Sequence, residues 1–248
     1  MTVGIYGLGR FGSFWARALT ERCEVIAWSR DPARQAPAGV RRARGEDELL
    51  ALPVVIYCVT ISAFEEVLGR TAGRLARGAL VMDTCSVKVH PVRAMERLLP
   101  AEVSILATHP MFGPDSGRQG LAGLPMVLCP SRVREGELAQ WREVFAAMGL
   151  TVMTMEPEEH DRQAAWTQGV THYVGRVLKD LGIGSSPLAT VGYRRLLETV
   201  EQTCNDPWQL FLDLQRYNPY TREMRARLRE SLDSVMAAIG DREDPAEP

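Results

Sequence analysis

The feature that most constrains the fold of this chain is a glycine-rich turn close to its first residue. The apolar run at 3–6 leads directly into GLGRFG at 7–12, and a helix-like stretch extends from there to Thr20. The three glycines allow a tight turn, a close approach of the backbone to a ligand, and close packing of the helix against the strand. A GxGxxG pattern between a strand and a helix is typical of the first unit of a doubly wound α/β domain.

Short apolar runs then alternate with helix-like segments up to residue 155. The runs occupy residues 24–28, 54–59, 80–82, 103–107, 126–128 and 150–155, and the helix-like segments between them include 63–75, 91–99 and 135–148. Buried strands that alternate with helices indicate a parallel sheet that is covered on both faces. We therefore predict an α/β fold with an N-terminal, Rossmann-type doubly wound domain over residues 1–153.

The character of the chain changes after Pro157, because no further strand pattern follows. We predict one long helix at 158–181 and three more at 193–202, 207–217 and 221–239, with an irregular polar tail. Helices in this number form an all-helical domain over residues 154–248, which would expose much apolar surface if it stood alone. This domain is expected to need a partner surface.

Composition excludes several classes of partner. Lysine and arginine number 29 against 31 aspartate and glutamate, so the net charge of −2 gives no reason to expect a nucleic acid or a charged membrane surface as partner. The five cysteines show no paired spacing and the four histidines show no metal-ligand spacing. We expect a cytoplasmic protein in a reducing compartment, without a metal and without a membrane span.

The glycine-rich turn predicts a dinucleotide site, since the N-terminus of a helix attracts a pyrophosphate. The second apolar run ends in Trp28-Ser29-Arg30-Asp31, where NAD enzymes usually place an acidic residue for the ribose 2′-hydroxyl. Ser29 and Arg30 can bind a 2′-phosphate, whereas Asp31 precedes a proline and is expected to cap or turn the chain. NADP is favoured over NAD, although Arg30 is also explained as a surface charge. The residues expected to contact the cofactor are Gly7, Leu8, Gly9, Arg10, Phe11, Gly12, Ser29, Arg30, Val59 and Thr60.

Two polar segments follow predicted strands, at the sheet edge where open α/β sheets bind ligands. They are DTCSVK at 83–88 and THPMFGP at 108–114. Two prolines stiffen the predicted loop around His109, and an imidazole suits proton abstraction near neutral pH. Ser86 and His109 are therefore candidate catalytic residues, with a packed structural histidine as the alternative for the second.

Other polar residues in these segments have plainer explanations. Lys88 is expected to be a surface charge at the start of a helix. His90 and His160 are expected to lie at the surface or to cap helices. None of the three is assigned to the catalytic site.

The two segments, in this order behind GLGRFG, resemble the prephenate and arogenate dehydrogenases of tyrosine biosynthesis. QGVTHYVGR at 168–176 resembles the histidine-bearing first helix of that family's C-terminal domain, and NDPW at 205–208 resembles its later Asp-Pro step. The resemblance implies that a hydride leaves C4 of a cyclohexadienol for the nicotinamide and that the ring carboxylate leaves as carbon dioxide. It further implies His109 as the base, Ser86 as an orienting residue, His172 in the substrate pocket, and a homodimer through the helical domain.

The sequence departs from the family at one position. Many members carry an arginine five residues before the Asp-Pro step, where it pairs with a substrate carboxylate, but this chain has Glu201. Arg194, Arg195 and Arg176 are candidates to replace that arginine, and each is also explained as a surface residue. An acidic residue in the pocket would instead suit the amino group of arogenate or of a ring-amino analogue of prephenate.

Two other functions remain open from the sequence. A β-hydroxyacid or imine reductase would share the domain order, but it usually relies on a lysine in the helical domain, where Lys179 is the one lysine. A non-catalytic NADP-binding regulatory protein would have no use for both Ser86 and His109. A dehydrogenase of prephenate or arogenate is the prediction.

Overall fold

The computed structural model describes residues 1–240, and the predicted irregular tail at 241–248 lies outside the described residues. Its first part is an eight-stranded sheet in the order β3-β2-β1-β4-β5-β6-β7-β8. The strands are β1 (Thr2–Tyr6), β2 (Glu24–Trp28), β3 (Arg41–Arg42), β4 (Val54–Tyr57), β5 (Leu80–Asp83), β6 (Ser104–Pro110), β7 (Pro125–Pro130) and β8 (Thr151–Thr154). All neighbouring strands are parallel except β6 and β7, which are antiparallel. The doubly wound prediction is confirmed, but the expectation of a fully parallel sheet was wrong at this pair.

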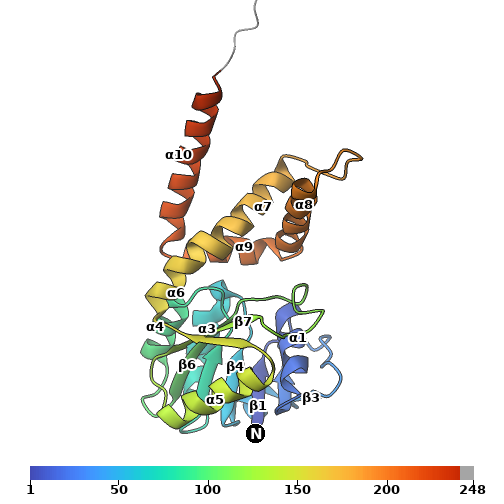
Figure 1. The fold of residues 1–248 in the computed structure, drawn as a ribbon. Helices are drawn as coiled ribbons and strands as arrows, with labels where there is room; N and C mark the ends of the chain where they lie inside the picture. Colours follow the sequence, from blue (N-terminus) through green and yellow to red (C-terminus); the bar gives the residue numbers. More distant parts are fainter. Residues whose placement is uncertain (241–248) are drawn as a thin grey trace, which may run out of the picture.

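Helices cover both faces of the sheet (Figure 1). On one face, α1 (Arg10–Leu19) and α5 (Glu135–Ala147) bury Trp15, Trp141 and Phe145 against the strands. On the other face lie α2 (Glu46–Leu50), α3 (Ile61–Thr71), the short helix η1 (Ala72–Arg74) and α4 (Val89–Leu98). The short β3 and α2 carry too few residues for a periodic pattern, and the sequence did not predict them.

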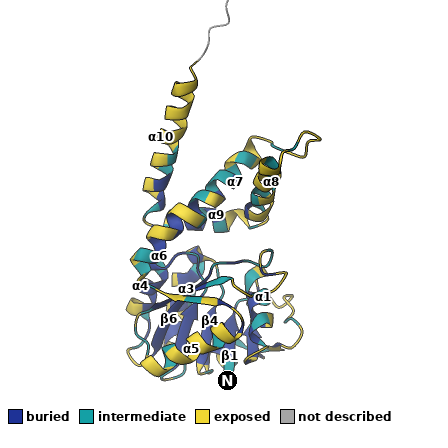
Figure 2. Cartoon of the chain, viewed as in Figure 1, coloured by how far each residue is buried: buried dark blue, intermediate teal, exposed yellow. Residues whose placement is uncertain are grey.

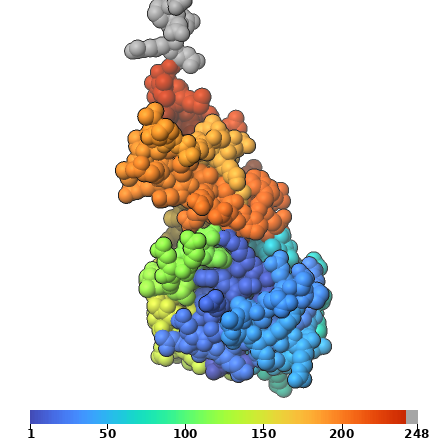
Figure 3. All heavy atoms as spheres, turned by 90° about the vertical axis from the view of Figure 1, so that its right-hand side faces the viewer, coloured from blue at the N-terminus to red at the C-terminus, as the bar shows by residue number. Residues whose placement is uncertain are grey.

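The rest of the described chain is helical and sits on the carboxyl end of the sheet (Figures 1 and 3). It consists of α6 (Pro157–Ala164), a π-helical turn η2 (Ala165–Gly169), α7 (Val170–Asp180), α8 (Val191–Cys204), α9 (Trp208–Tyr217) and α10 (Thr221–Ile239). The long helix predicted at 158–181 forms, but the π turn interrupts it. No helix among residues 1–240 has the length and apolarity to cross a membrane.

Two buried aspartates of the helical part cap helices of the sheet domain. The carboxylate of Asp161 in α6 accepts the N–H groups of Lys88 at 2.6 Å and Val89 at 3.0 Å, where α4 begins. The carboxylate of Asp213 in α9 accepts the N–H of Ser62 at 3.0 Å, in the first turn of α3. Because these N–H groups have no partner within their own helices, the contacts join the two parts of the chain. The domain division at 153/154 stays a prediction.

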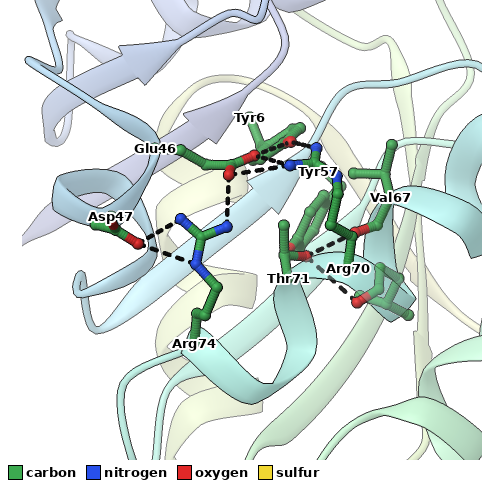
Figure 4. Close-up of polar contacts among 9 residues, drawn as sticks. Tyr6, Glu46, Asp47, Tyr57, Val67, Arg70, Thr71 and Arg74 are labelled. Atoms are coloured by element: carbon green, nitrogen blue, oxygen red, sulfur yellow. Dashed lines mark hydrogen bonds and ion pairs between the residues drawn. The ribbon is translucent and has the colours of Figure 1, made fainter.

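A polar network holds the end of β1, just before the glycine-rich turn (Figure 4). The hydroxyl of Tyr6 donates to Glu46 at 2.5 Å, and the same carboxylate pairs with Arg70 at 2.8 Å and Arg74 at 2.6 Å. Burial raises the pKa of Tyr6, with Glu46 adding to the effect, so the phenol stays protonated and can donate. The network fixes α2, α3 and η1 against the strand that leads into the turn.

Candidate active site

A cavity of about 670 Å³ lies between the carboxyl ends of the central strands and the helical part. Its lining combines the glycine-rich turn, the segments that follow β4 and β5, the end of β6, α7 and the turn between α8 and α9. Ligands of open α/β sheets bind at this edge of the sheet. The cavity has room for part of a cofactor together with a small substrate, and residues of both the sheet part and the helical part line it.

The glycine-rich turn has the shape that a pyrophosphate requires. Gly7 has a φ of +111°, and a Cβ there would collide with the carbonyl oxygen of Cys58. A Cβ on Gly12 would collide with the carbonyl oxygen of Gly7, whereas the space beside Gly9 is open for 4 Å. The N-terminus of α1 has no side-chain cap, so its N–H groups remain for an anion. These residues fit a bound dinucleotide.

The predicted cofactor residues divide into two groups. Gly9, Arg10, Phe11, Gly12, Val59 and Thr60 line the cavity. Gly7 shapes the turn, and Leu8 is buried in the core behind it. Ser29 and Arg30 lie in the loop after β2 and do not line the cavity.

One cavity residue of this loop, Arg34, was missed by the sequence reasoning. Arg34 reaches the cavity because of the way the loop folds, and no pattern in the neighbouring sequence predicts that fold. Asp31 accepts the N–H of Ala33 at 2.9 Å, which confirms its predicted role in turning the chain. The guanidinium of Arg42 donates to the carbonyl of Asp31 at 3.2 Å and holds the loop in place.

His109 and Ser86 reach the same cavity from neighbouring strands. His109 lies within β6 and pairs with Val127 of β7, so the prediction of a loop at this position was wrong. The antiparallel pairing with β7 extends the strand to Pro110 and buries the imidazole, which is 2% exposed. Ser86 follows β5 and is half-buried. The two candidate catalytic residues therefore converge on one space.

A chain of hydrogen bonds defines the tautomer of His109. Its Nδ1 lies 2.8 Å from Nε2 of His160, and Nδ1 of His160 lies 2.8 Å from Oδ1 of Asp161. The carboxylate of Asp161 accepts, so Nδ1 of His160 carries a hydrogen and its Nε2 accepts from Nδ1 of His109. Nε2 of His109 is then left as a free base, and among residues 1–240 it has no hydrogen-bond partner. The expectation of a surface or capping His160 was wrong, because α6 buries it against His109.

Burial makes His109 neutral at ordinary pH. Desolvation, aided by His160, Lys88 and His172, lowers the pKa of His109 well below its usual value. Burial also lowers the pKa of His160, although Asp161 opposes the shift. A neutral imidazole with a free Nε2 can accept a proton from a ligand hydroxyl.

The sequence led us to expect Lys88 at the surface, but this expectation was wrong, because the residue lies in the interior. Its side chain is completely buried, and Nζ donates to Asp83 at 2.5 Å and to the carbonyl of Thr108 at 2.5 Å. Asp83 also accepts the N–H of Cys85 at 2.9 Å. The buried carboxylate needs a charged partner, which turns the lysine inward. This pair joins the ends of β5 and β6, which carry Ser86 and His109.

The helical part contributes two side chains with unpartnered polar atoms. His172 lines the cavity, as predicted. Burial is the main cause that lowers the pKa of His172 to about 4, and the positive charge of Arg176 adds to the shift. Gln168, one turn earlier, lines the cavity too and was missed, although its spacing from His172 is a signal for one helix face. Nδ1 of His172 and Oε1 of Gln168 are buried and have no hydrogen-bond partner within residues 1–240. Such atoms are candidates for contacts with a ligand, and π turns like η2 often occur at functional sites.

The residues proposed to replace the missing arginine lie elsewhere. Arg176 donates to the carbonyl of Asp206 at 2.6 Å and packs over the ring of Trp208 at 5.1 Å, so it holds the turn between α8 and α9. Arg194 donates to the carbonyl of Ala189 at 2.8 Å. Arg195 and Glu201 are exposed. Neither these three arginines nor Glu201 lines the cavity of the single chain.

Two acidic side chains line the cavity in their place. Asp115 follows the HPMFG segment, and Asp206 belongs to the Asn-Asp-Pro step. The guanidinium of Arg10 lies between them, with Nη2 2.5 Å from Asp115 and Nη1 3.0 Å from Asp206. The hydrogen bond from Arg10 lowers the pKa of Asp115, while burial raises that of Asp206 against the opposing charge of Arg10.

Comparisons with known proteins cover almost the whole chain. Residues 15–154 match the family described as prephenate dehydrogenase, nucleotide-binding domain, and residues 177–247 match the family described as TYRAAT1-like, C-terminal domain. Arogenate dehydrogenase 2, chloroplastic, of Arabidopsis thaliana is 37% identical over 95% of this chain and 69% of its own length. Arogenate dehydrogenase 1, chloroplastic, of the same plant is 34% identical over 96% of this chain and 39% of its own. A crystal structure of prephenate dehydrogenase from A. aeolicus, in complex with hydroxyphenyl propionate and NAD+, superposes with a TM-score of 0.77 at 19% identity, over 96% of this chain and 90% of that one.

Proposed function

The chain belongs to the prephenate dehydrogenase family, and from that premise we propose that it catalyses the NAD(P)-dependent oxidative decarboxylation of arogenate or prephenate. The observation that carries the proposal is the buried His109, with Nε2 free and Nδ1 held by His160 and Asp161. This base faces the same cavity as the glycine-rich turn that fits a dinucleotide. The products are tyrosine from arogenate and 4-hydroxyphenylpyruvate from prephenate.

The chemistry divides between the cofactor and the protein. The bound nicotinamide supplies the acceptor for the hydride that leaves C4 of the substrate. Nε2 of His109 takes the proton of the 4-hydroxyl as C4 becomes a carbonyl carbon, and Ser86 orients that hydroxyl. The bond from the ring to its carboxylate then breaks and carbon dioxide leaves. The electron pair makes the ring aromatic and leaves a phenolate at C4, which takes the proton back from the imidazolium of His109.

The relay behind His109 stabilises the positive charge that this proton brings. The imidazolium donates from Nδ1 to His160, whose own Nδ1 donates to the carboxylate of Asp161. A buried imidazolium without that carboxylate would be costly, because burial disfavours the charged form. The relay therefore fixes the tautomer before the reaction and lowers the energy of the charged form during it.

We propose arogenate as the preferred substrate. Asp115 and Asp206 line the cavity, so it suits the side-chain ammonium group of arogenate better than the keto group that prephenate carries at the same position. The two plant relatives described above, both named arogenate dehydrogenases, support this choice. A carboxylate in a partly desolvated site binds an ammonium through charge-assisted hydrogen bonds.

We further propose NADP as the preferred cofactor. The loop after β2 presents Ser29 and Arg30, and Arg34 of the same loop lines the cavity. The nearby acidic residue, Asp31, is engaged with the N–H of Ala33 and with Arg34 at 3.5 Å. A guanidinium binds the 2′-phosphate that distinguishes NADP, whereas a free acidic residue would repel it.

The assembly that we propose is a homodimer through the helical part, in a reducing compartment such as the cytoplasm. Large apolar side chains are exposed in the single chain, among them Val177 of α7, Leu196 of α8 and Met236 of α10. Figure 2 shows α10 as largely exposed. All five cysteines are free thiols. Exposed apolar patches of this kind are usually covered by a partner.

Turnover assays with the purified full chain test the function. Arogenate, prephenate and 4-amino-4-deoxyprephenate are each supplied with NADP+ and then with NAD+, and the absorbance of the reduced nicotinamide is followed. We expect the fastest reduction with arogenate and NADP+. No reduction with any pair, by a folded protein that still binds NADP+, would leave a regulatory role as the better explanation.

A further inference from the structure

A single guanidinium joins three segments along the active-site cavity. Arg10 is the first residue of α1. Its Nη1 donates to Oδ1 of Asp206 at 3.0 Å, in the turn between α8 and α9, and its Nη2 donates to Oδ2 of Asp115 at 2.5 Å, between β6 and β7. We call these three residues the Arg10 bridge. The bridge connects the glycine-rich turn to the β6–β7 connection and to the helical part.

The Arg10 bridge combines two carboxylates with one cation, so it has a net charge of −1. One oxygen of each carboxylate is engaged by Arg10, while Oδ2 of Asp206 accepts no hydrogen bond within the described residues. All three residues line the cavity. An ammonium group that entered the cavity would therefore find Asp206 only partly neutralised by the guanidinium.

Arg10 also begins the helix whose N-terminus would receive the pyrophosphate of a dinucleotide. The N-terminus of α1 has no side-chain cap, and the space beside Gly9 is open. Phosphate oxygens at that helix terminus would stand next to the first residue of the helix, which is Arg10. A guanidinium binds phosphate and carboxylate with the same planar set of donors, so the two anions compete for it.

We propose that Arg10 couples dinucleotide binding to recognition of an ammonium group on the substrate, an inference that rests on the proposed function. Without dinucleotide, Arg10 holds Asp115 and Asp206. When the pyrophosphate binds, Arg10 turns toward it and frees Asp206 for the substrate's ammonium. Because linkage is reciprocal, a ligand with an ammonium group then raises the affinity for the dinucleotide by the same factor.

Calorimetric titration of NADP+ tests this coupling. Its Kd is measured alone, with saturating L-tyrosine, which carries the ammonium, and with 4-hydroxyphenylpyruvate, which lacks it. For the wild type we expect L-tyrosine to tighten NADP+ binding about five-fold or more, a typical lower bound for coupled sites. We expect 4-hydroxyphenylpyruvate to change the Kd by less than about two-fold, since it gives Asp206 no cation to bind.

The matched variants are Arg10→Gln, Arg10→Lys and Arg17→Gln. Arg17 is an exposed arginine in the last turn of the same helix and is not part of the cavity. We expect the L-tyrosine effect to vanish in Arg10→Gln and to persist in Arg17→Gln. Arg10→Lys keeps the positive charge but lacks the planar guanidinium that bridges two carboxylates. We therefore expect its L-tyrosine effect to lie between those of the wild type and of Arg10→Gln.

Two results would overturn the proposal: an Arg10→Gln protein with the wild-type coupling factor, or a wild-type protein without coupling. The turnover of arogenate and prephenate by the wild type is measured first and separately. If neither substrate is oxidised, the proposed function fails. If turnover is normal and the coupling is absent or independent of Arg10, the role of Arg10 alone fails.

Discussion

The base strength of His109 depends on its burial, and this has a consequence for the pH dependence of catalysis. The pKa of His109 is lowered well below 6.5, first by desolvation and then by His160, Lys88 and His172. The proposed reaction needs the neutral imidazole of His109, so we expect activity to be lost as the pH falls through this lowered pKa. We expect the acid limb of the pH profile of kcat/KM to lie below pH 6.5. An acid limb at or above that value, in a protein shown to be folded there, would contradict the assignment of His109 as a buried neutral base.

Asp161 fixes the tautomer of the relay, so its charge can be tested without changing its shape. In Asp161→Asn an amide NH₂ in the place of Oδ1 would donate to Nδ1 of His160, which reverses both bonds and puts the hydrogen of His109 on Nε2. The same NH₂ could no longer accept the N–H of Lys88. We expect kcat to fall by roughly 10² to 10⁴-fold, since loss of the correct tautomer costs about that much in comparable relays. The KM for substrate should change little. Glu158→Gln, on the same helix and exposed, is the control, and thermal unfolding checks that the cap on α4 survives.

Asp206 allows a prediction about substrate choice. Asp206→Asn keeps the size of the side chain and removes the charge that an ammonium would bind. We expect kcat/KM for arogenate to fall roughly ten- to a hundred-fold, because hydrogen bonds to charged groups contribute about 1.5–3 kcal/mol. The value for prephenate should change much less or rise. Equal losses for both substrates would show that Asp206 acts only through the shape of the turn.

At the scale of elements, the network around Glu46 links the stability of α2, α3 and β1 to pH. Burial alone would raise the pKa of Glu46, but hydrogen bonds from Tyr6, Arg74 and Arg70 outweigh it and lower the pKa below 4.5. A lowered carboxyl pKa gives stability that is present above pH 4.5 and is lost as the pH falls through the folded value. We expect Glu46→Gln to lower the free energy of unfolding by about 1–3 kcal/mol at neutral pH. Urea titrations at several pH values measure this, with the exposed Glu143→Gln as control; equal losses at neutral and strongly acidic pH would contradict the role of the charge.

How well the elements could be predicted depended on whether their signal was local. The long helices and the buried strands have strong periodic patterns, so their positions followed from the sequence. The antiparallel β6–β7 pair was missed because an apolar run looks the same whether the strand is parallel or antiparallel to its neighbour. The direction of β7 is set by the path of the chain that joins it to β6. The π turn η2 was missed because its hydrogen bonds leave no distinct composition.

The same distinction separates the site residues. Ser86, His109 and His172 stand in recognisable motifs, and the structure places all three on the cavity. His160 and Lys88 were assigned to the surface because their burial depends on contacts with residues far away in the chain. His160 meets His109 across a separation of 51 residues. Arg10 was expected only at the cofactor, and its bond to Asp206 spans 196 residues, a pairing that no local pattern can indicate.

At the scale of the whole molecule, α10 extends away from the rest of the chain and is largely exposed (Figures 1 and 2). One of its exposed faces carries an apolar stripe. Leu232, Val235, Met236 and Ile239 share a helix face and are between 54% and 76% exposed. In the proposed dimer, a second copy of the chain covers this stripe. We expect the wild type to be a dimer by light scattering, and Val235→Asp to shift it toward monomer, because a charge cannot enter an apolar interface without a partner. Ser234→Asp places the same charge on the opposite face of the helix and should leave the dimer intact. A dimer that persists in Val235→Asp, or a wild type that is monomeric at assay concentration, would mean that the stripe has some other function.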